Sequence, residues 1–323
     1  MAVETRLDPE RSLADDVLDG LTRPFKELAP KYFYDQHGAE LFDQICEQPE
    51  YYPTRAERSI LEARSAAIVQ RTAAGELVEL GSGTAAKTRV LLTAMADAGT
   101  LKRYVPVDVT AHMVKRTADE LVAEFPGLRV DGVVGDFERH LDAVPAATDG
   151  VPRIVALLGG TIGNFIPGSR RGFLRSIAEL LRPGADHLLL GTDLVKDPAV
   201  IEAAYNDAAG VTAAFNRNIL VVLNRELDAN FDVDAFEHYA FFDREREWIE
   251  MRLRATRRMD VRIEALGLDV SFAAREEIRT EISAKFTRER LARDLAAAGL
   301  ELREVLTDDD GLFALSLSAR PPG

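Results

Sequence analysis

Short apolar runs alternate with amphipathic stretches between residues 75 and 193, a pattern typical of a parallel sheet connected by crossover helices. Residues 154–158 are all apolar, which suits a central strand covered on both faces. After each run, apolar residues recur at helical spacing and predict the buried faces of the intervening helices. Strands are expected at residues 77–80, 104–107, 154–158 and 188–190. We therefore predict a doubly wound, Rossmann-like α/β core.

The rest of the chain predicts two additions to this core. Two strand-like runs, 300–306 and 312–318, flank an acidic turn and are expected to add strands to the far edge of the sheet. Residues 196–285 predict a helix and then an antiparallel sheet, because apolar residues there alternate in steps of two. We expect the core to comprise residues 56–195 and 286–323. An inserted α+β domain would comprise residues 1–55 and 196–285.

Composition and charge narrow the possible partners and the compartment. The chain has 323 residues, with 40 Lys and Arg against 54 Asp and Glu, and its net charge of −14 disfavours nucleic acid and anionic membranes. The single cysteine, Cys46, favours a reducing compartment. Neither a secretory signal nor an apolar run long enough for a membrane helix is visible. We expect a cytoplasmic protein that acts as a monomer and does not bind membranes.

A glycine turn follows the first predicted strand, and an acid follows the second. Gly81 and Gly83 allow backbone amides to approach a ligand at a helix N-terminus, although such a turn is as often purely structural. Asp108 lies 25 residues after Gly83 at a predicted strand end, where an acid can bind ribose hydroxyls. Together these features indicate a nucleoside-containing cofactor.

Two further strand ends point to the same edge of the sheet, where ligands of open α/β sheets bind. Asp136 and Phe137 supply a carboxylate and a ring, which suit the amine and the face of a base. Gly159, Thr161 and Asn164 follow the most apolar strand and would present backbone and an amide beside the cofactor. Each block alone is more often a turn than a site, so the prediction depends on their convergence.

The charges near the glycine turn favour S-adenosylmethionine over a nicotinamide dinucleotide. Glu79 at the strand end suits a cationic ammonium better than a pyrophosphate, and Lys87 is placed to meet a carboxylate. A nicotinamide-dependent oxidoreductase remains an alternative on the glycine turn and Asp108 alone. The five histidines lack metal-ligand spacing, so no metal is expected.

Several blocks of sequence are recognisable together. They are Lys-Tyr-Phe-Tyr-Asp at 31–35, Glu-Leu-Phe-Asp at 40–43, Pro-Glu-Tyr-Tyr-Pro-Thr-Arg at 49–55, Glu-Leu-Gly-Ser-Gly at 79–83, Gly-Thr-Asp at 191–193, Tyr-Asn-Asp at 205–207 and Ala-Phe-Asn at 214–216. With these blocks, the chain closely resembles the L-histidine-specific Nα-methyltransferases of ergothioneine biosynthesis, from about residue 31 to the C-terminus. This family is similar to class I methyltransferases with an added substrate domain.

The resemblance implies a role for individual residues. S-adenosylmethionine would be held by Gly81, Lys87, Asp108, Asp136 and Phe137, to which the strand-end argument adds Gly159 and Thr161. For histidine, the resemblance implies that Asn164 and Tyr205 bind the α-carboxylate, that Glu281 and Ser283 recognise the imidazole, and that Tyr51 lies between the two ligands. Glu281 and Ser283 are two residues apart and so share one face of a predicted strand, and Met251 is expected to line the same pocket.

The reaction implied is three successive methyl transfers to the α-nitrogen of L-histidine, which give hercynine. Tyr34 is the candidate proton acceptor or relay, and Phe42, Tyr51 and Tyr34 would offer ring faces to the growing cation. Tyr34 as a packed aromatic is an equally good interpretation. A methyltransferase of the same fold that acts on a different amine, or a binding protein without activity, would also fit these residues.

Overall fold

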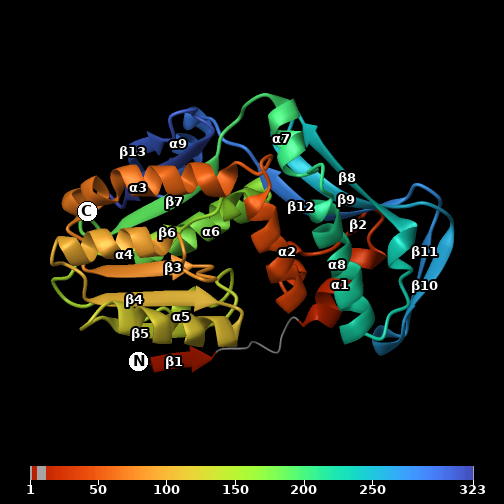
Figure 1. Cartoon of the computed structure of the whole chain (residues 1–323), viewed down its shortest axis with the longest axis horizontal. Coiled ribbons are helices and arrows are strands. Elements are labelled where there is room, and N and C mark those ends of the chain that lie inside the picture. Colours follow the sequence, from red (N-terminus) through yellow and green to blue (C-terminus); the bar gives the residue numbers. More distant parts are fainter. Residues whose placement is uncertain (1, 6–11, 323) are drawn as a thin grey trace. The chain divides into compact units, whose positions relative to one another are not determined.

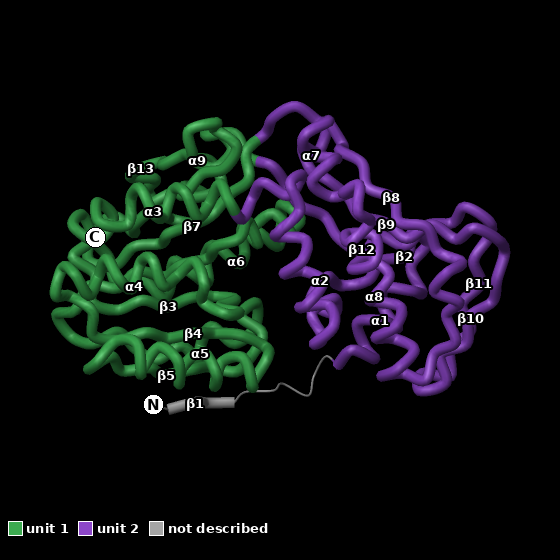
Figure 2. The backbone as a smooth tube through the Cα atoms, viewed as in Figure 1, with its two compact units in different colours: residues 1–7, 55–194, 286–323 green, residues 8–54, 195–285 purple. Residues whose placement is uncertain are grey.

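The computed structural model describes residues 2–5 and 12–322 and divides the chain into two compact units (Figures 1 and 2). Unit 1, green in Figure 2, comprises residues 1–7, 55–194 and 286–323. Unit 2, purple in the same figure, comprises residues 8–54 and 195–285. The chain therefore leaves unit 1 and returns to it twice.

Unit 1 contains an eight-stranded sheet in the order β1-β5-β4-β3-β6-β7-β14-β13. The first six strands in this order run parallel, and the last two pair antiparallel. The C-terminal runs thus add strands at one edge of the sheet, as the sequence predicted. The bounds of the strands are β1 Ala2–Thr5, β3 Glu76–Leu80, β4 Arg103–Asp108, β5 Arg129–Val134, β6 Arg153–Leu157, β7 His187–Asp193, β13 Glu301–Thr307 and β14 Phe313–Ala319.

The strand order reverses at β3. From β3 the chain moves to β4 on one side and later to β6 on the other. Because such crossovers are right-handed, connections that run in opposite directions place their helices on opposite faces of the sheet. Doubly wound sheets bind their ligands at such a reversal, which here lies at the carboxyl ends of β3 and β6. The predicted doubly wound core is confirmed.

Helices cover the sheet through apolar faces. Ile60 of α3, Leu91 of α4 and Leu121 of α5 belong to one buried cluster with alternate residues of the central strands. Phe173 and Ile177 of α6 are buried outside that cluster. The helices are α3 Pro53–Thr72, α4 Thr88–Asp97, α5 Ala111–Glu124, α6 Pro167–Leu180 and α9 Arg288–Ala297, with short 3₁₀ helices η2 Leu141–Ala143 and η3 Thr161–Asn164.

The first strand corrects one sequence-based expectation. Residues 1–55 were expected to belong wholly to the inserted domain, but β1 pairs in parallel with β5 at the edge of the unit 1 sheet. Four residues do not show the repeated apolar pattern that revealed the other strands. Pairing with a neighbour that comes more than a hundred residues later is visible only in the tertiary structure.

Unit 2 combines helices with a small sheet. Its four-stranded sheet has the order β2-β12-β9-β8, in which β12, β9 and β8 are antiparallel. Strands β10 and β11 form an antiparallel hairpin between β9 and β12 in the sequence. The elements are α1 Leu13–Thr22, β2 Lys26–Glu27, η1 Pro30–Phe33, α2 Gln36–Glu47, α7 Pro198–Ala204, α8 Val211–Glu226, η4 Val233–Ala235, β8 Phe236–Asp243, β9 Trp248–Ala255, β10 Met259–Ile263, η5 Glu264–Leu266, β11 Leu268–Phe272 and β12 Glu277–Ala284.

Helix α8 packs on this sheet and also on α2. Its buried side includes Phe215, Ile219 and Leu223, which recur at helical spacing. Asp207, which precedes the helix, accepts hydrogen bonds from the backbone N–H groups of its first two residues, Val211 and Thr212. Within the described ranges, none of the helices has the length and apolar character needed to cross a membrane.

Candidate functional site

The glycine turn after β3 is held by Asp108, the last residue of β4. Gly81 has a φ of +77°, and a Cβ there would lie 3.4 Å from the Phe137 ring, so a side chain would be strained at this position. Asp108 accepts hydrogen bonds from the backbone of Gly83 at 2.9 Å and of Thr110 at 3.0 Å. Each of its oxygens retains a second lone pair, so the carboxylate can also accept from ribose hydroxyls.

The block after β5 brings its ring to the same turn. Asp136 accepts a hydrogen bond from the backbone of Glu138 at 2.9 Å, and its own N–H donates to Nδ1 of His140 at 3.0 Å. Beside it, Phe137 faces Gly81 and lies 5.7 Å from the ring of Phe173. The structure thus places Gly81, Asp108, Asp136 and Phe137 in contiguous loops at one end of the sheet.

Glu57, on α3, organises two predicted cofactor residues and was missed by the sequence analysis. Its side chain is completely buried, pairs with the ammonium of Lys87 and accepts the backbone N–H of Gly159 at 2.8 Å. A Cβ on Gly191 would collide with the Glu57 carboxylate, so any larger residue there would displace this side chain. Its one sequence signal is its place two residues after the Pro-Thr-Arg block.

Glu79, at the end of β3, is held within the core by two hydroxyl groups. Its carboxylate is buried and accepts hydrogen bonds from the hydroxyls of Thr88 and Tyr104. Burial raises the pKa of Glu79 to about 7, although these two bonds oppose the rise. Glu79 therefore links the end of β3 to α4 and β4, and its interaction with an ammonium group stays a prediction.

One polar side chain of the loop after β6 forms a hydrogen bond within the loop itself. The Thr161 hydroxyl donates to the carbonyl of Leu158 at 2.9 Å, and Asn164 is half-buried at the end of η3. Ser82 in the glycine turn has a buried hydroxyl that meets no hydrogen-bond partner among the residues described. A buried polar atom without a partner in this turn is a group that a polar ligand bound there would satisfy.

Aromatic side chains form a cluster in unit 2. The Tyr51 ring lies 6.1 Å from the Phe42 ring and 6.4 Å from the Tyr205 ring, edge to face in both cases. Tyr34 packs edge to face 5.5 Å from Phe42 and from Phe215 but stays 41% exposed. Burial raises the pKa of Tyr51 well above its usual value, so its hydroxyl stays neutral. The structure brings together the four aromatic residues that the sequence analysis assigned to the substrate.

Strands β12 and β9 supply polar groups to unit 2. Glu281 lies directly opposite Met251 in the strand register, and Ser283 follows on the same face. Burial raises the pKa of Glu281 to about 7, and the positive charge of Lys285 opposes the rise. Lys285 is completely buried, and its ammonium lies 3.0 Å from Ser283 Oγ and 3.1 Å from the Tyr205 hydroxyl. The sequence analysis did not single out this lysine.

A buried network holds the backbone of Tyr205. Asn216 Nδ2 donates to His238 Nδ1 at 2.9 Å, which leaves the proton on Nε2 to donate to the Tyr205 carbonyl at 2.8 Å. The Thr280 hydroxyl lies 2.6 Å from the Asn216 amide oxygen. Burial lowers the pKa of His238, which keeps this ring neutral.

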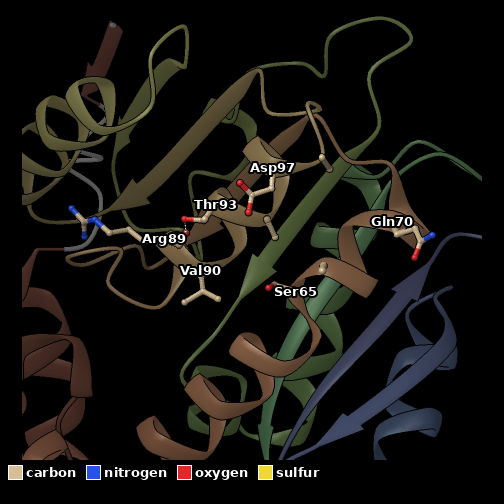
Figure 3. Close-up of a pocket in the computed structure, with 9 residues that line it drawn as sticks. Ser65, Gln70, Arg89, Val90, Thr93 and Asp97 are labelled. Carbon is tan, nitrogen blue, oxygen red and sulfur yellow. Dashed lines mark hydrogen bonds between the residues drawn. The ribbon is translucent and has the colours of Figure 1, made fainter.

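An open pocket of about 720 Å³ lies between α3 and α4 (Figure 3). Ser65, Gln70, Val90 and Thr93 are among its lining residues, and none of the predicted site residues is. It is a groove between two helices of unit 1. No group of acids, histidines or cysteines in the described part of the chain is arranged to hold a metal ion.

A doubly wound sheet, with an antiparallel pair at its edge and acids at successive strand ends, is the architecture of a class I methyltransferase. The chain belongs to the family of histidine-specific, S-adenosylmethionine-dependent methyltransferases, whose sequence model matches residues 13–320.

Relatives of known activity are similar over most of the chain. The histidine N-alpha-methyltransferase of Mycolicibacterium smegmatis is 53% identical over 96% of this chain and 95% of that protein. Its counterpart in Mycobacterium tuberculosis is 52% identical over the same shares. Ergothioneine biosynthesis protein 1 of Neurospora crassa is 26% identical over 85% of this chain and 31% of its own length.

Proposed function

We propose that this protein methylates the α-amino group of L-histidine three times, with S-adenosylmethionine as the methyl donor, and so forms hercynine for ergothioneine biosynthesis. The observation that carries the proposal is the family membership, together with 53% identity to a histidine N-alpha-methyltransferase along nearly the whole chain. The polar pair Glu281 and Ser283 on one face of β12 supports a ligand with a small polar ring.

Unit 1 is the proposed binding unit for S-adenosylmethionine. When bound, this molecule supplies an electrophilic methyl carbon on a sulfonium. Asp108 would accept hydrogen bonds from the ribose, Asp136 from the base amine, and Phe137 would cover the base. Lys87, oriented by Glu57, would meet the carboxylate. Gly81, Gly159 and Thr161 would line the ligand with backbone and a hydroxyl.

Unit 2 is the proposed binding unit for most of the histidine. Glu281 would accept the imidazole N–H, Ser283 would donate to the other ring nitrogen, and Met251 would pack beside the ring. Tyr205 would bind the α-carboxylate. Tyr51 and Phe42 would offer ring faces to the methylated nitrogen, whose positive charge becomes permanent after the last transfer.

Each transfer requires a neutral amine and releases one proton. The nitrogen lone pair forms the new N–C bond as the S–C bond breaks, so the main tasks of the protein are to orient the amine and to accept its proton. Tyr34 is the proposed relay, because its partly exposed side chain borders the aromatic cluster and can pass a proton to water.

The test is a time course by mass spectrometry with S-adenosylmethionine and each of the twenty amino acids. A mass increase of three methyl groups on L-histidine alone is the expected result. An increase on another amino acid would assign a different acceptor to the same fold. No increase on any amino acid, with S-adenosylmethionine bound, would overturn the proposed reaction and leave the cofactor assignment standing.

A further inference from the structure

Lys285 is a completely buried lysine that follows directly after β12. Lysine is among the residue types least often buried, because its ammonium loses its hydration. The register of β12 continues to this residue, since its N–H donates to the carbonyl of Glu247 at 2.8 Å. Its side chain therefore lies on the same strand face as Glu281 and Ser283. A buried ammonium in this place requires partners that replace its lost hydration.

The ammonium contacts groups from two separate segments of unit 2. It donates to Ser283 Oγ at 3.0 Å and to the Tyr205 hydroxyl at 3.1 Å, and it lies 4.7 Å from the centre of the Tyr205 ring. Ser283 is the residue proposed to meet the imidazole, and Tyr205 the one proposed to meet the α-carboxylate. One cation thus joins the residues assigned to the two ends of the substrate.

The chemistry of an ammonium group determines the direction of these hydrogen bonds. An ammonium has only donors, so both hydroxyl oxygens must accept from it. The hydrogen of the Ser283 hydroxyl then turns away from Lys285, and Ser283 becomes a donor toward whatever lies on its other side. In its ionised form, the Glu281 carboxylate can only accept. The strand face therefore presents one donor and one acceptor, two positions apart.

We propose that Lys285 is a positioning residue that makes Ser283 an obligatory hydrogen-bond donor, and that it thereby selects side chains carrying both a donor and an acceptor nitrogen. This inference rests on the proposed function. Neutral imidazole satisfies both groups, because one nitrogen donates to Glu281 and the other accepts from Ser283. Imidazolium, pyrrole and indole have no acceptor nitrogen and would leave the Ser283 hydroxyl unpaired.

The test measures binding of three ligands to the full chain by calorimetry. They are L-histidine and its two pyrrole analogues. In each analogue, one of the two ring nitrogens of the imidazole is replaced by C–H. The wild-type protein should bind both analogues about 10-fold or more weakly than histidine, as expected when a buried hydroxyl loses its partner. In Lys285→Met, histidine should bind about 10-fold more weakly, and the preference over the pyrroles should shrink toward unity.

Lys196→Met is the matched control. Lys196 also contacts a tyrosine of unit 2, with its ammonium 2.8 Å from the Tyr52 hydroxyl and 4.5 Å from the centre of that ring, but it is not placed at the proposed pocket. This variant should keep both the histidine affinity and the preference. If Lys285→Met does not fold, Lys285→Gln serves instead, because an amide both donates and accepts and so releases the constraint on Ser283.

A double variant separates positioning from general support. In Ser283→Ala, the Lys285→Met change should no longer alter the histidine-to-pyrrole ratio. An equal loss for all three ligands in Lys285→Met, or an unchanged histidine affinity, would overturn the inference. If the wild-type protein itself does not bind histidine, the proposed function fails, and that outcome is distinct from either of these.

Discussion

At the scale of single residues, the same alternation that revealed Glu281 and Ser283 continues to Lys285. The sequence predicted the first two because polar residues two apart share a strand face. The third was overlooked because a lysine in sequence normally indicates a solvated position. Glu57 was overlooked for a similar reason, since its exposure and its contacts with Lys87 and Gly159 depend on where α3 packs.

Replacing Glu281 with alanine should weaken histidine binding by about 1–3 kcal/mol, because a buried ring N–H would lose its acceptor. Calorimetry with L-histidine measures this loss, and the affinity for S-adenosylmethionine should not change. Glu277→Ala is the control on the same strand, since that carboxylate pairs with Arg252 and Arg254. Unaltered histidine binding in Glu281→Ala would remove this residue from the pocket.

Replacing Glu57 with alanine should both destabilise the protein and weaken S-adenosylmethionine binding. The change strips Lys87 of a buried partner and leaves the Gly159 N–H unpaired, so we expect a loss of about 2 kcal/mol or more in the free energy of unfolding. Denaturant unfolding and calorimetry measure the two effects. Glu62→Ala, at an exposed position of the same helix, should show neither. Wild-type affinity in a destabilised Glu57→Ala would limit this residue to a structural role.

At the scale of elements, unit 2 is tied together by a polar network that no local pattern reveals. Asn216 on α8 and His238 on β8 are 22 residues apart, yet they form one chain of hydrogen bonds that ends at the carbonyl of Tyr205. The period of the apolar residues predicted the helix and the strands separately. Which polar groups meet between a helix and a sheet depends on how the two pack, so this network had to be seen in the structure.

This network predicts a dependence of stability on pH. Burial holds the pKa of His238 below its usual 6.5, so the unfolded chain binds a proton first as the pH falls. The contribution of neutral His238 to stability is complete above about pH 6.5 and is lost as the pH falls below that value, by at most about 1.4 kcal/mol per pH unit. Urea unfolding from about pH 8 to about pH 5.5 should show the decline, and His238→Gln should reduce it.

His187 of unit 1 also has a lowered pKa and contributes to the same decline, because burial disfavours its charged form. His187→Gln therefore separates the two contributions. If His238→Gln has the same pH profile as the wild-type protein, the His238 ring does not carry the effect.

At the scale of the whole molecule, two compact units come from interleaved segments of one chain. Residues 55–194 and 286–323, together with β1, build the sheet of unit 1, and residues 195–285 belong to unit 2 (Figure 2). The change from long apolar runs to two-residue alternation marks this insertion in the sequence. The proposed function assigns one ligand mainly to each unit. This assignment can be tested by ligand binding, without an activity assay.

Hydrogen exchange with each ligand alone tests this assignment. S-adenosylmethionine should slow exchange in the turns after β3, β4 and β5 of unit 1, because bound groups and reduced opening protect backbone amides. L-histidine should slow exchange in β9 and β12 and around Tyr205 of unit 2. S-adenosylhomocysteine serves as the control and should protect the same turns of unit 1, since it lacks only the transferred methyl group and the positive charge on sulfur. Protection by histidine confined to unit 1 would contradict the assignment.

The sequence alone determined the doubly wound core, the insertion, the glycine turn with its strand-end acids, and the position of Glu281 and Ser283 on one face of a strand. These features depend on local periodicity, and the carboxyl ends of parallel strands must meet at one edge. The tertiary structure decided the rest: β1 at the sheet edge, Glu57 beneath Lys87, Glu79 within the core, and Lys285 between Ser283 and Tyr205. Each of these depends on contacts between distant segments, which side-chain packing determines and no short pattern encodes.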